Sequence, residues 1–483
     1  MPSIDYHAIA PEIVLSATIF LVLAVDLFLP PERKWWAMPI SFLGVAGTLA
    51  ATLTLIGTHR VTFGTYVIDN FAVLFKVFFL VVALVVLALS LRFFQEGRYY
   101  QGEYYFLTLS SFLGMLCMAS SRDLLMLFIA LELVSAPAFL MAGFRKRDPR
   151  SNEAALKFFL MGVLSTAVML YGMSLVYGVT GTITLEGIGI ALSGPGGNSP
   201  LALAAILFVV VGFAFKVSAV PFQFWAPDTY EGSPIPVAAF LSVASKAAGF
   251  AGLLSLMFVA FRGQAEFWTP IFAVLSVATM TIGNLVALQQ RQVVRLFAYS
   301  SIAQSGYMLL PFALVGTDPV VNGQAFSAAV FYILVYAVMN LGAFAVVTAV
   351  AREAPGALIT DFAGLARRAP IHTGAMILFL VSLAGVPFFS PGFFGKVAIF
   401  TAAVAADQLW LAIVMVVNSV ISVVYYLAIV RQMMFVDVEG VQPLRSPRLV
   451  TAVVGLAALA TVALGVFPDL LAHFPPLSTL VAK

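Results

Sequence analysis

The 483-residue sequence contains very little of the chemistry that cofactor-binding proteins use. It has one cysteine, Cys117, which lies inside an apolar run, and four histidines that lack the spacing of metal ligands. Neither a Cys-x-x-Cys pair nor a glycine-rich phosphate loop occurs in it. We therefore expect no disulfide, no metal cluster and no bound cofactor on this chain. Any redox cofactor must lie on another polypeptide.

Charge is also scarce. Only 10% of the residues are charged and 62% are hydrophobic, against roughly 25% and 45–50% in soluble domains. Apolar runs close to the ~20 residues that cross a bilayer as a helix recur along the whole chain. The sequence therefore predicts an all-α polytopic membrane protein, in which the first apolar run is a span and not a cleaved signal.

Polar breaks divide the apolar sequence into fourteen expected transmembrane spans. They cover residues 11–30, 36–57, 69–92, 103–120, 123–143, 153–178, 200–221, 237–261, 267–288, 293–315, 323–350, 371–403, 408–434 and 449–471.

Lysine and arginine are distributed unequally between the two sets of loops. The loops that follow even-numbered spans, together with the C-terminus, hold only Arg60, Arg122, Arg262 and Lys483, while the loops after odd-numbered spans hold most of the others. By the positive-inside rule, the odd loops face the cytoplasm. Both termini are then expected on the outer side of the membrane.

Five of the eight lysines fall inside apolar segments, whereas the arginines stay at or near the membrane edges. A charged side chain at the centre of a span costs about 2.5–3.5 kcal/mol on insertion scales. Lysine loses its proton readily when it is desolvated and arginine effectively never does, so buried lysines suit proton exchange. The clearest acid within a span is Glu132. The five lysines are Lys76, Lys157, Lys216, Lys246 and Lys396.

Two of these lysines frame the most informative stretch of the chain. Lys216 lies in an apolar helix that is expected to break at Pro221, and a polar loop over residues 225–234 precedes the apolar run that carries Lys246. Lys396 likewise follows a Pro- and Gly-rich break. Broken helices leave backbone groups free, which is tolerable only inside protein or in a wet cavity.

For each of these charged residues, a purely structural role is an alternative to proton transfer. Lys76 is expected to be structural, pairing locally or reaching water. Lys157 follows Glu153 by four residues, so a surface pair on one helix competes with a role in proton transfer. The alternative role for Lys246 is to hydrogen-bond the end of a broken helix. The alternative role for Glu132 is to neutralise a lysine and hold helices in register.

An internal repeat is indicated by short matches. Val220-Pro221-Phe222 has a counterpart in Val386-Pro387-Phe388, and Ala167-Val168-Met169-x-x-Gly172 in Ala337-Val338-Met339-x-x-Gly342. Five spans separate the members of each pair, and an odd number inverts the topology. Spans 4–8 and 9–13 are therefore expected to form two inverted five-helix repeats, with discontinuous helices at spans 7 and 12. The expected units are residues 1–102, 103–262, 263–435 and 436–483.

Several motifs resemble one family specifically: subunit N of the proton-pumping NADH:quinone oxidoreductase, respiratory complex I. The motifs are PFQFWAPDTYEGSPIPVAAFLSVASKAAGF (221–250), LLMLFIALELVSAPAF (124–139), RLFAYSSIAQSGY (295–307), FYILVYAVMNLGAFAV (331–346) and LAGVPFFSPGFFGK (383–396). The resemblance covers spans 4 to 13. The related L and M subunits and the Mrp-type antiporter subunits tend to carry a histidine- and alanine-rich version of the first motif.

The resemblance implies an antiporter-like subunit that moves protons without a cofactor of its own. It assigns proton transfer to Glu132, Lys216, Lys246 and Lys396, with Lys157 and Gln304 as further candidates. NADH, FMN, iron–sulfur clusters and quinone are then expected on other subunits. The expected partners are the lipid bilayer and neighbouring membrane-arm subunits of the M and the small K and J types, with no nucleic acid. The expected location is the inner (plasma) membrane of a bacterium.

The chain departs from this family at two positions. Relatives often carry histidine where this sequence has Gln223 and Gln304. Glutamine donates and accepts hydrogen bonds but does not titrate, so these positions are expected to act only by ordering water. Two other functions stay open: a stand-alone or Mrp-type cation/proton antiporter, and a purely structural membrane scaffold.

Overall fold

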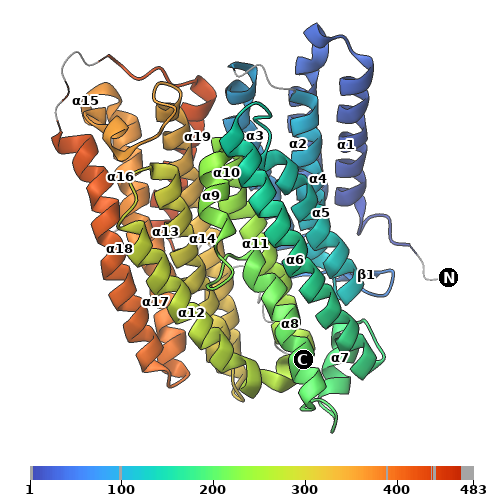
Figure 1. Ribbon diagram of the computed structural model, residues 1–483. Helices are drawn as coiled ribbons and strands as arrows, with labels where there is room; N and C mark the ends of the chain where they lie inside the picture. Colours follow the sequence, from blue (N-terminus) through green and yellow to red (C-terminus); the bar gives the residue numbers. More distant parts are fainter. Residues whose placement is uncertain (1–3, 97–100, 388–389, 437, 439–441, 469–483) are drawn as a thin grey trace.

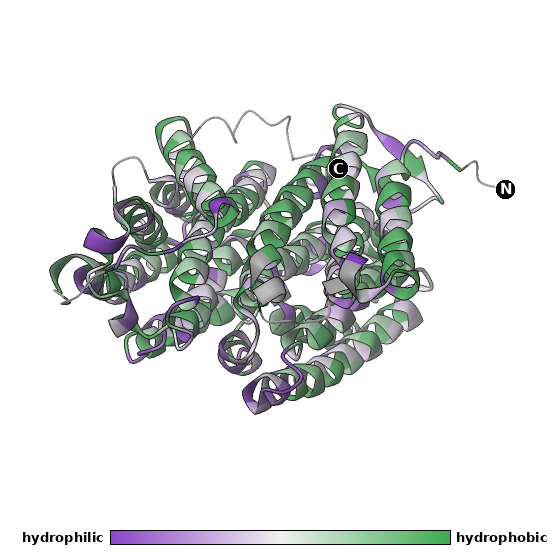
Figure 2. Cartoon of the chain, turned by 90° about the horizontal axis from the view of Figure 1, so that it is seen from above, coloured by the Kyte–Doolittle hydropathy of each residue, from purple (hydrophilic) through white to green (hydrophobic). Residues whose placement is uncertain are grey.

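The computed structural model describes residues 4–96, 101–387, 390–436, 438 and 442–468. Long helices run side by side, with α1 and α2 at one side of the molecule and α18 at the other (Figure 1). Hydrophobic residues recur along the helices (Figure 2). The α-helices are α1 (Ala10–Phe28), α2 (Ala37–Leu53), α3 (Asn70–Glu96), α4 (Gln101–Ser120), α5 (Leu124–Ala142), α6 (Pro149–Thr180), α7 (Leu185–Leu192), α8 (Pro200–Lys216), α9 (Trp225–Gly232), α10 (Ile235–Phe240), α11 (Lys246–Ser255), α12 (Ala265–Ala287), α13 (Val293–Leu309), α14 (Pro319–Ala351), α15 (Leu365–Arg368), α16 (Pro370–Ala384), α17 (Pro391–Ala405), α18 (Leu409–Phe435) and α19 (Arg448–Val466).

Several of these helices begin at the same sequence signal, a capping side chain followed by proline. Asp148, Ser199, Asp318 and Ser390 each accept a hydrogen bond from a backbone N–H of the first turn, and each precedes a proline. The cap satisfies a donor that has no partner within the helix, and proline has no N–H to satisfy. These caps fix the starts of α6, α8, α14 and α17.

Within the described residues, ten helical segments are long and apolar enough to cross a membrane, and α8, α16 and α17 are shorter apolar helices. Every predicted span coincides with a helix or a pair of helices. The count of fourteen is reached only by adding α4, α13, α8 and the α16–α17 pair to the ten, so the number of crossings stays a prediction. The end of the last expected span, residues 469–471, and both chain termini lie outside the described residues.

The centre of the molecule consists of α14 and the helical segment Ile235–Ala260, which are almost entirely buried. This segment contains α10 and α11 joined by a π-helical turn, Leu241–Ser245, and it ends in a second one, Leu256–Ala260. By contrast, α1, α2, α6, α18 and α19 each expose an apolar face. The one large core spans all of these helices, so Lys246 lies at the middle of the protein.

The two expected helix breaks are confirmed. The first separates α8 from α9, and the second separates α16 from α17. One long helix packs against both halves in each case: α6 against α8 and α9, and α14 against α16 and α17. This shared arrangement supports the repeat, whereas the residue boundaries of the repeats and of the four units stay a prediction. Phe388, part of one repeat match, lies outside the described residues.

One expectation about local structure was wrong. The polar loop expected over residues 225–234 is largely helix α9, whose carboxylates are paired with cations from two other helices. The all-α fold is confirmed, and the exception to it in the described residues is a short antiparallel hairpin, β1 (Arg60–Thr62) and β2 (Tyr66–Ile68), which joins α2 to α3. Three-residue strands are too short to produce a readable alternation of apolar and polar residues.

Candidate functional site

Lys216 is the last residue of α8, at the edge of the first break, and its side chain is buried. Its Nζ donates a hydrogen bond to the Ser135 hydroxyl, at 2.8 Å. Ser135 lies on α5 three residues after Glu132, so the two share one face of the helix. Oε1 of Glu132 is buried and has no hydrogen-bond partner among the described residues. Lys216 therefore contacts a hydroxyl next to the acid, and not the carboxylate itself.

The break after Lys216 leaves polar groups inside the protein. The backbone N–H of Val220 donates to Thr279 Oγ1 of α12, at 3.0 Å, and the Trp225 indole donates to the Phe215 carbonyl at 3.1 Å. Ser218 Oγ and Gln223 Oε1 are buried without a partner in the described part of the chain. The backbone of the break is thus anchored at both ends, while two side-chain oxygens remain open to a donor.

Lys246 is the first residue of α11 and directly follows the π-helical turn. Its Nζ donates to the carbonyl oxygen of Ser301 at 2.9 Å and to its hydroxyl at 2.6 Å. The Tyr336 hydroxyl also donates to Ser301 Oγ, at 3.0 Å. Gly249, one turn after Lys246, has no Cβ, and one built there would lie 2.9 Å from Lys216 Cγ. The aliphatic stem of Lys216 therefore packs on the helix that carries Lys246.

Gln304 lies one turn after Ser301 on α13, and both ends of its amide are bonded. Oε1 accepts a hydrogen bond from Tyr332, at 2.5 Å, and Nε2 donates to the Leu383 carbonyl at 3.1 Å. Gln304 thus bridges protein groups directly, and not only through ordered water. The Gln304 side chain does not titrate. Its two hydrogen bonds hold the Tyr332 hydroxyl and the Leu383 carbonyl in place.

Lys396 lies on α17, after the second break, and reaches back to the first half of the same broken helix. Its Nζ donates to the carbonyls of Leu383, at 3.3 Å, and Ala384, at 2.8 Å. These are the last residues of α16, where unpaired carbonyls and the helix dipole both favour a cation. The Nζ also lies 4.6 Å from the centre of the Tyr307 ring.

Together these contacts form a row of polar groups through the buried centre. Glu132 and Ser135 lead to Lys216, which packs against the helix of Lys246; Ser301 and Gln304 then lead to the Leu383 carbonyl, which Lys396 shares. Three buried amines, two of them bonded to serine hydroxyls and the third to backbone carbonyls, can accept and release protons. All four main predicted site residues, and Gln304, therefore lie in one row.

Lys157 lies outside this row. Its side chain is 46% exposed and forms ion pairs with Glu153 and with Asp228 of α9, both at 2.7 Å. Arg295 of α13 pairs with Asp228, at 2.8 Å, and with Glu231, at 2.7 Å. The pairing of Lys157 with Glu153 is confirmed, and the structure places Lys157 at an accessible edge instead of in the interior. This chain of five charges, called here the edge cluster, joins α6, α9 and α13.

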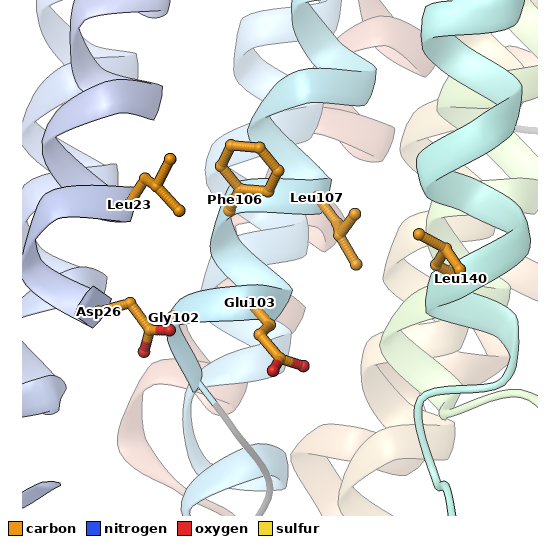
Figure 3. A pocket seen from close by; sticks show the side chains of 7 residues that line it. All are labelled: Leu23, Asp26, Gly102, Glu103, Phe106, Leu107 and Leu140. Carbon is orange, nitrogen blue, oxygen red and sulfur yellow. The ribbon is translucent and has the colours of Figure 1, made fainter.

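A surface pocket lies apart from the row, between α1, α4 and α5. Leu23, Phe106, Leu107 and Leu140 form its apolar part, and the carboxylates of Asp26 and Glu103 lie at one end (Figure 3). Both carboxylates are paired with lysines, Asp26 with Lys34 and Glu103 with Lys146. The pocket adds no free titratable group to the row.

Sequence reasoning missed the groups that connect the charges: Ser135, Ser301 and Tyr332, and the backbone carbonyl of Leu383. Spacing offered a signal for Ser135, three residues after Glu132, and for Ser301, three before Gln304. A backbone carbonyl carries no signal in a sequence. Within the part of the chain that is described, no group of three or more His, Cys, Asp or Glu is placed to hold a metal ion.

The fold and the row define a class: polytopic membrane proteins with two lysine-bearing broken helices, one in each antiporter-like half. A family model described as NADH:quinone oxidoreductase/Mrp antiporter, TM, matches residues 121–422. The chain is 40% identical to NADH-quinone oxidoreductase subunit N of Moorella thermoacetica, over 97% of each chain. The chain belongs to the subunit N family of NADH-quinone oxidoreductase.

Two solved structures are similar to this chain, one in fold and sequence and the other in fold alone. A chain of respiratory complex I from Thermus thermophilus, solved with bound aureothin, has a TM-score of 0.81 and 32% identity, covering 96% of this chain and 99% of that chain. A chain of the Mrp complex from Dietzia sp. has a TM-score of 0.83 but only 20% identity, covering 98% of this chain and 96% of that chain. The second likeness shows the fold alone, so the Mrp alternative is less supported.

Proposed function

We propose that this chain is a proton-translocating, antiporter-like subunit of NADH:quinone oxidoreductase, and that Glu132, Lys216, Lys246 and Lys396 transfer the protons. The observation that carries the proposal is the succession of polar contacts along the row. Lys246 donates to Ser301, Gln304 lies one turn further along the same helix, and Gln304 and Lys396 both donate to the Leu383 carbonyl. A scaffold has no need for three fully enclosed amines, each of which is costly to bury.

In the first half, the Ser135 hydroxyl is the switchable contact. It donates to the Leu131 carbonyl, at 2.7 Å, while it accepts from Lys216. A small shift of α5 against α8 brings Lys216 closer to Glu132 or separates them, and the charge on Glu132 favours the protonated amine only when the two are close. A proton released from Lys216 has Lys246 as its nearest amine along the row.

In the second half, proton transfer depends on Ser301. Its hydroxyl contacts both Lys246 and Tyr336, and a hydroxyl can donate and accept in turn. Gln304 holds the Leu383 carbonyl beside Lys396 but carries no proton itself. Lys396 then exchanges the proton beside the last turn of α16, whose end carbonyls it contacts.

We further propose that the chain performs no redox chemistry of its own. The NADH, FMN, iron–sulfur clusters and quinone that its family uses belong to other subunits, and the driving energy arrives from them through neighbouring membrane subunits of the M, K and J types. The chain resides in the lipid bilayer of a bacterial plasma membrane with both termini outside, since arginine and lysine gather in the loops after odd-numbered spans.

The test is proton pumping per electron in assembled complex carrying Lys216→Ala, with quinone reduction measured in the same vesicles. We expect pumping to be lost while assembly is retained. The matched control is Lys146→Ala, which removes a lysine whose side chain is 62% exposed. An unchanged ratio in Lys216→Ala would overturn the assignment of Lys216. Sodium-dependent proton flux by the isolated, reconstituted chain would instead favour a stand-alone antiporter.

A further inference from the structure

A second buried Glu–Lys pair lies in the N-terminal three helices, outside the row. The Lys76 side chain on α3 is fully buried, and its Nζ lies 2.7 Å from Oε1 of Glu12 on α1. The Tyr66 hydroxyl, on β2, donates to the same oxygen at 2.7 Å and lies 3.5 Å from Lys76 Nζ. The hairpin thus places a phenol over a pair formed between two helices. Lys76 has the local partner that its sequence position suggested.

The hydrogen bonding of this site is incomplete. Oε2 of Glu12 is enclosed and accepts no hydrogen bond from the described residues, although an ionised carboxylate has about four acceptor positions. Only 12% of the Glu12 side chain is exposed. A buried oxygen without a donor is costly, and it marks a place for a small donor such as water or a hydrated proton.

The site lies at one end of the bundle. Glu12 is in the first turn of α1, and Lys76 is within the first two turns of α3. Cys117 and Ser120 of α4 lie beside Tyr66. The neighbouring charged groups are paired or bonded: Asp69 with Arg122, and Asp5 with Arg60, while His7 contacts Thr54. Among these groups, Glu12 is a buried acid that keeps an open acceptor.

The site lies outside the row, and helix α4 packs between the two. Helix α4 packs against α1 and α3 as well as against α5 and α11. Gly114 of α4 is close to the α5 backbone, where a Cβ would lie 2.8 Å from the Val134 nitrogen. One helix therefore packs against the helices that carry Glu12 and Lys76 and against the helix that carries Glu132.

We propose that Glu12, Lys76 and Tyr66 form a second proton-binding site, which takes up one proton at the unpartnered carboxylate oxygen and returns it to water at the outer end of the bundle. This inference rests on the proposed function, since it adds an exchange point to the same proton-translocating subunit. When water supplies a proton to the open Oε2 of Glu12, the carboxylate becomes a neutral acid while Lys76 stays an ammonium. Return of that proton to water restores the ion pair, so each cycle takes up and releases one proton.

The test is the proton-to-electron ratio of the assembled complex with Glu12→Gln, compared with Lys216→Ala and with Asp26→Asn. Glutamine keeps the shape of Glu12 but takes up no proton. Asp26 is the matched control, because it is the other lysine-paired carboxylate of α1, at the opposite end of that helix. We expect Glu12→Gln to lower the ratio at unchanged assembly and Asp26→Asn to leave it as in the wild type.

The outcomes separate the two proposals. Loss in Lys216→Ala with a wild-type ratio in Glu12→Gln overturns this inference alone. A wild-type ratio in Lys216→Ala overturns the proposed function. A second measurement covers the case in which Glu12→Gln fails to assemble: infrared difference spectra of the wild-type complex between neutral and acid pH. A protonated-carboxyl band that shifts in Tyr66→Phe, which removes one donor to Glu12, supports the site. A spectrum unaffected by Tyr66→Phe indicates only a structural clamp and overturns it.

Discussion

The two broken helices hold their lysines in different ways. Lys216 ends the first half of its broken helix and reaches out to a side chain of another helix, Ser135. Lys396 lies in the second half of its broken helix. Its amine reaches back to the backbone carbonyls of Leu383 and Ala384 at the end of the first half. A hydroxyl on a neighbouring helix is lost when the helices shift, whereas carbonyls at a helix end persist. The comparison supports the proposal that Lys216 is the switched lysine and Lys396 a fixed exchange point.

The largest effect is expected from Gly385→Ala at the second break. Gly385 has φ +78°, and a Cβ there would lie 2.7 Å from Lys396 Cδ and 3.0 Å from its Nζ. A left-handed alanine costs about 1–2 kcal/mol, and the methyl group displaces the amine from its carbonyls. We expect loss of pumping and a lower melting temperature of the complex.

Gly249→Ala is the matched change in the first half, since its Cβ would lie 2.9 Å from Lys216 Cγ while the helix backbone stays right-handed. It should reduce pumping with a smaller change in melting temperature. Full pumping in assembled Gly385→Ala complex would show that the position of Lys396 does not matter.

Ser135→Ala sharpens the comparison at the first lysine. It removes the hydrogen-bond partner of Lys216, and bonds to charged groups contribute about 1.5–3 kcal/mol. We expect proton transfer to slow about tenfold, since 1.4 kcal/mol corresponds to a factor of ten, as measured by pumping in vesicles at matched quinone turnover. Ser110→Ala is the control, because that hydroxyl donates only within α4, to the Phe106 carbonyl. Equal rates in the two variants would remove Ser135 from the mechanism.

The second halves of the two broken helices, α9 and α17, differ in charge. Asp228 of α9 pairs with Lys157 and Arg295, whereas the sequence of α17 contains one charged residue, Lys396. Partial burial raises the pKa of Asp228, but hydrogen bonds from Lys157 and Arg295 outweigh it and hold the pKa below its ordinary value.

A carboxylate with a depressed pKa stabilises the fold above its unfolded pKa, and this contribution is lost as the pH falls through the folded value. Asp228→Asn should therefore lower stability by about 0.2–1 kcal/mol per exposed pair. The difference from wild type should be constant near neutral pH, begin to decrease near about pH 4 and disappear once the pH lies below the folded pKa of Asp228. Thermal unfolding of the complex across this range is the measurement, and a difference that grows on acidification would contradict the assignment.

The smallest effect on pumping among the residues of the row is expected at Gln304. Gln304→Ala removes the contacts to Tyr332 and to the Leu383 carbonyl, but Lys396 still holds that carbonyl. We expect a loss of about 1 kcal/mol in stability and a modest decrease in pumping. Gln304→His, which introduces a titratable ring, should pump at least as well as wild type. A complete loss of pumping in Gln304→Ala would make this residue part of the proton route and not only its support.

Much of the fold was readable because a bilayer constrains the chain so strongly. Apolar runs gave the helices, Pro and Gly gave both breaks, and the rarity of intramembrane charge singled out Glu132, Lys216, Lys246 and Lys396. Helix α9 and the hairpin were not readable. The polarity of α9 is compensated by ion pairs with distant helices, and the strands are too short to show a period.

The sequence by itself determined which side chains bear the charges, and local apolarity predicted the burial of Lys76, Lys216, Lys246 and Lys396. Only the tertiary structure decided which groups face them: Ser135 for Lys216, Ser301 for Lys246, backbone carbonyls for Lys396, and Glu12 with Tyr66 for Lys76. The same structure placed Lys157 at an accessible edge, where it pairs with Asp228. Hydrogen bonds act over about 3 Å, and segments 12 to 81 residues apart in the chain must pack before any such distance exists.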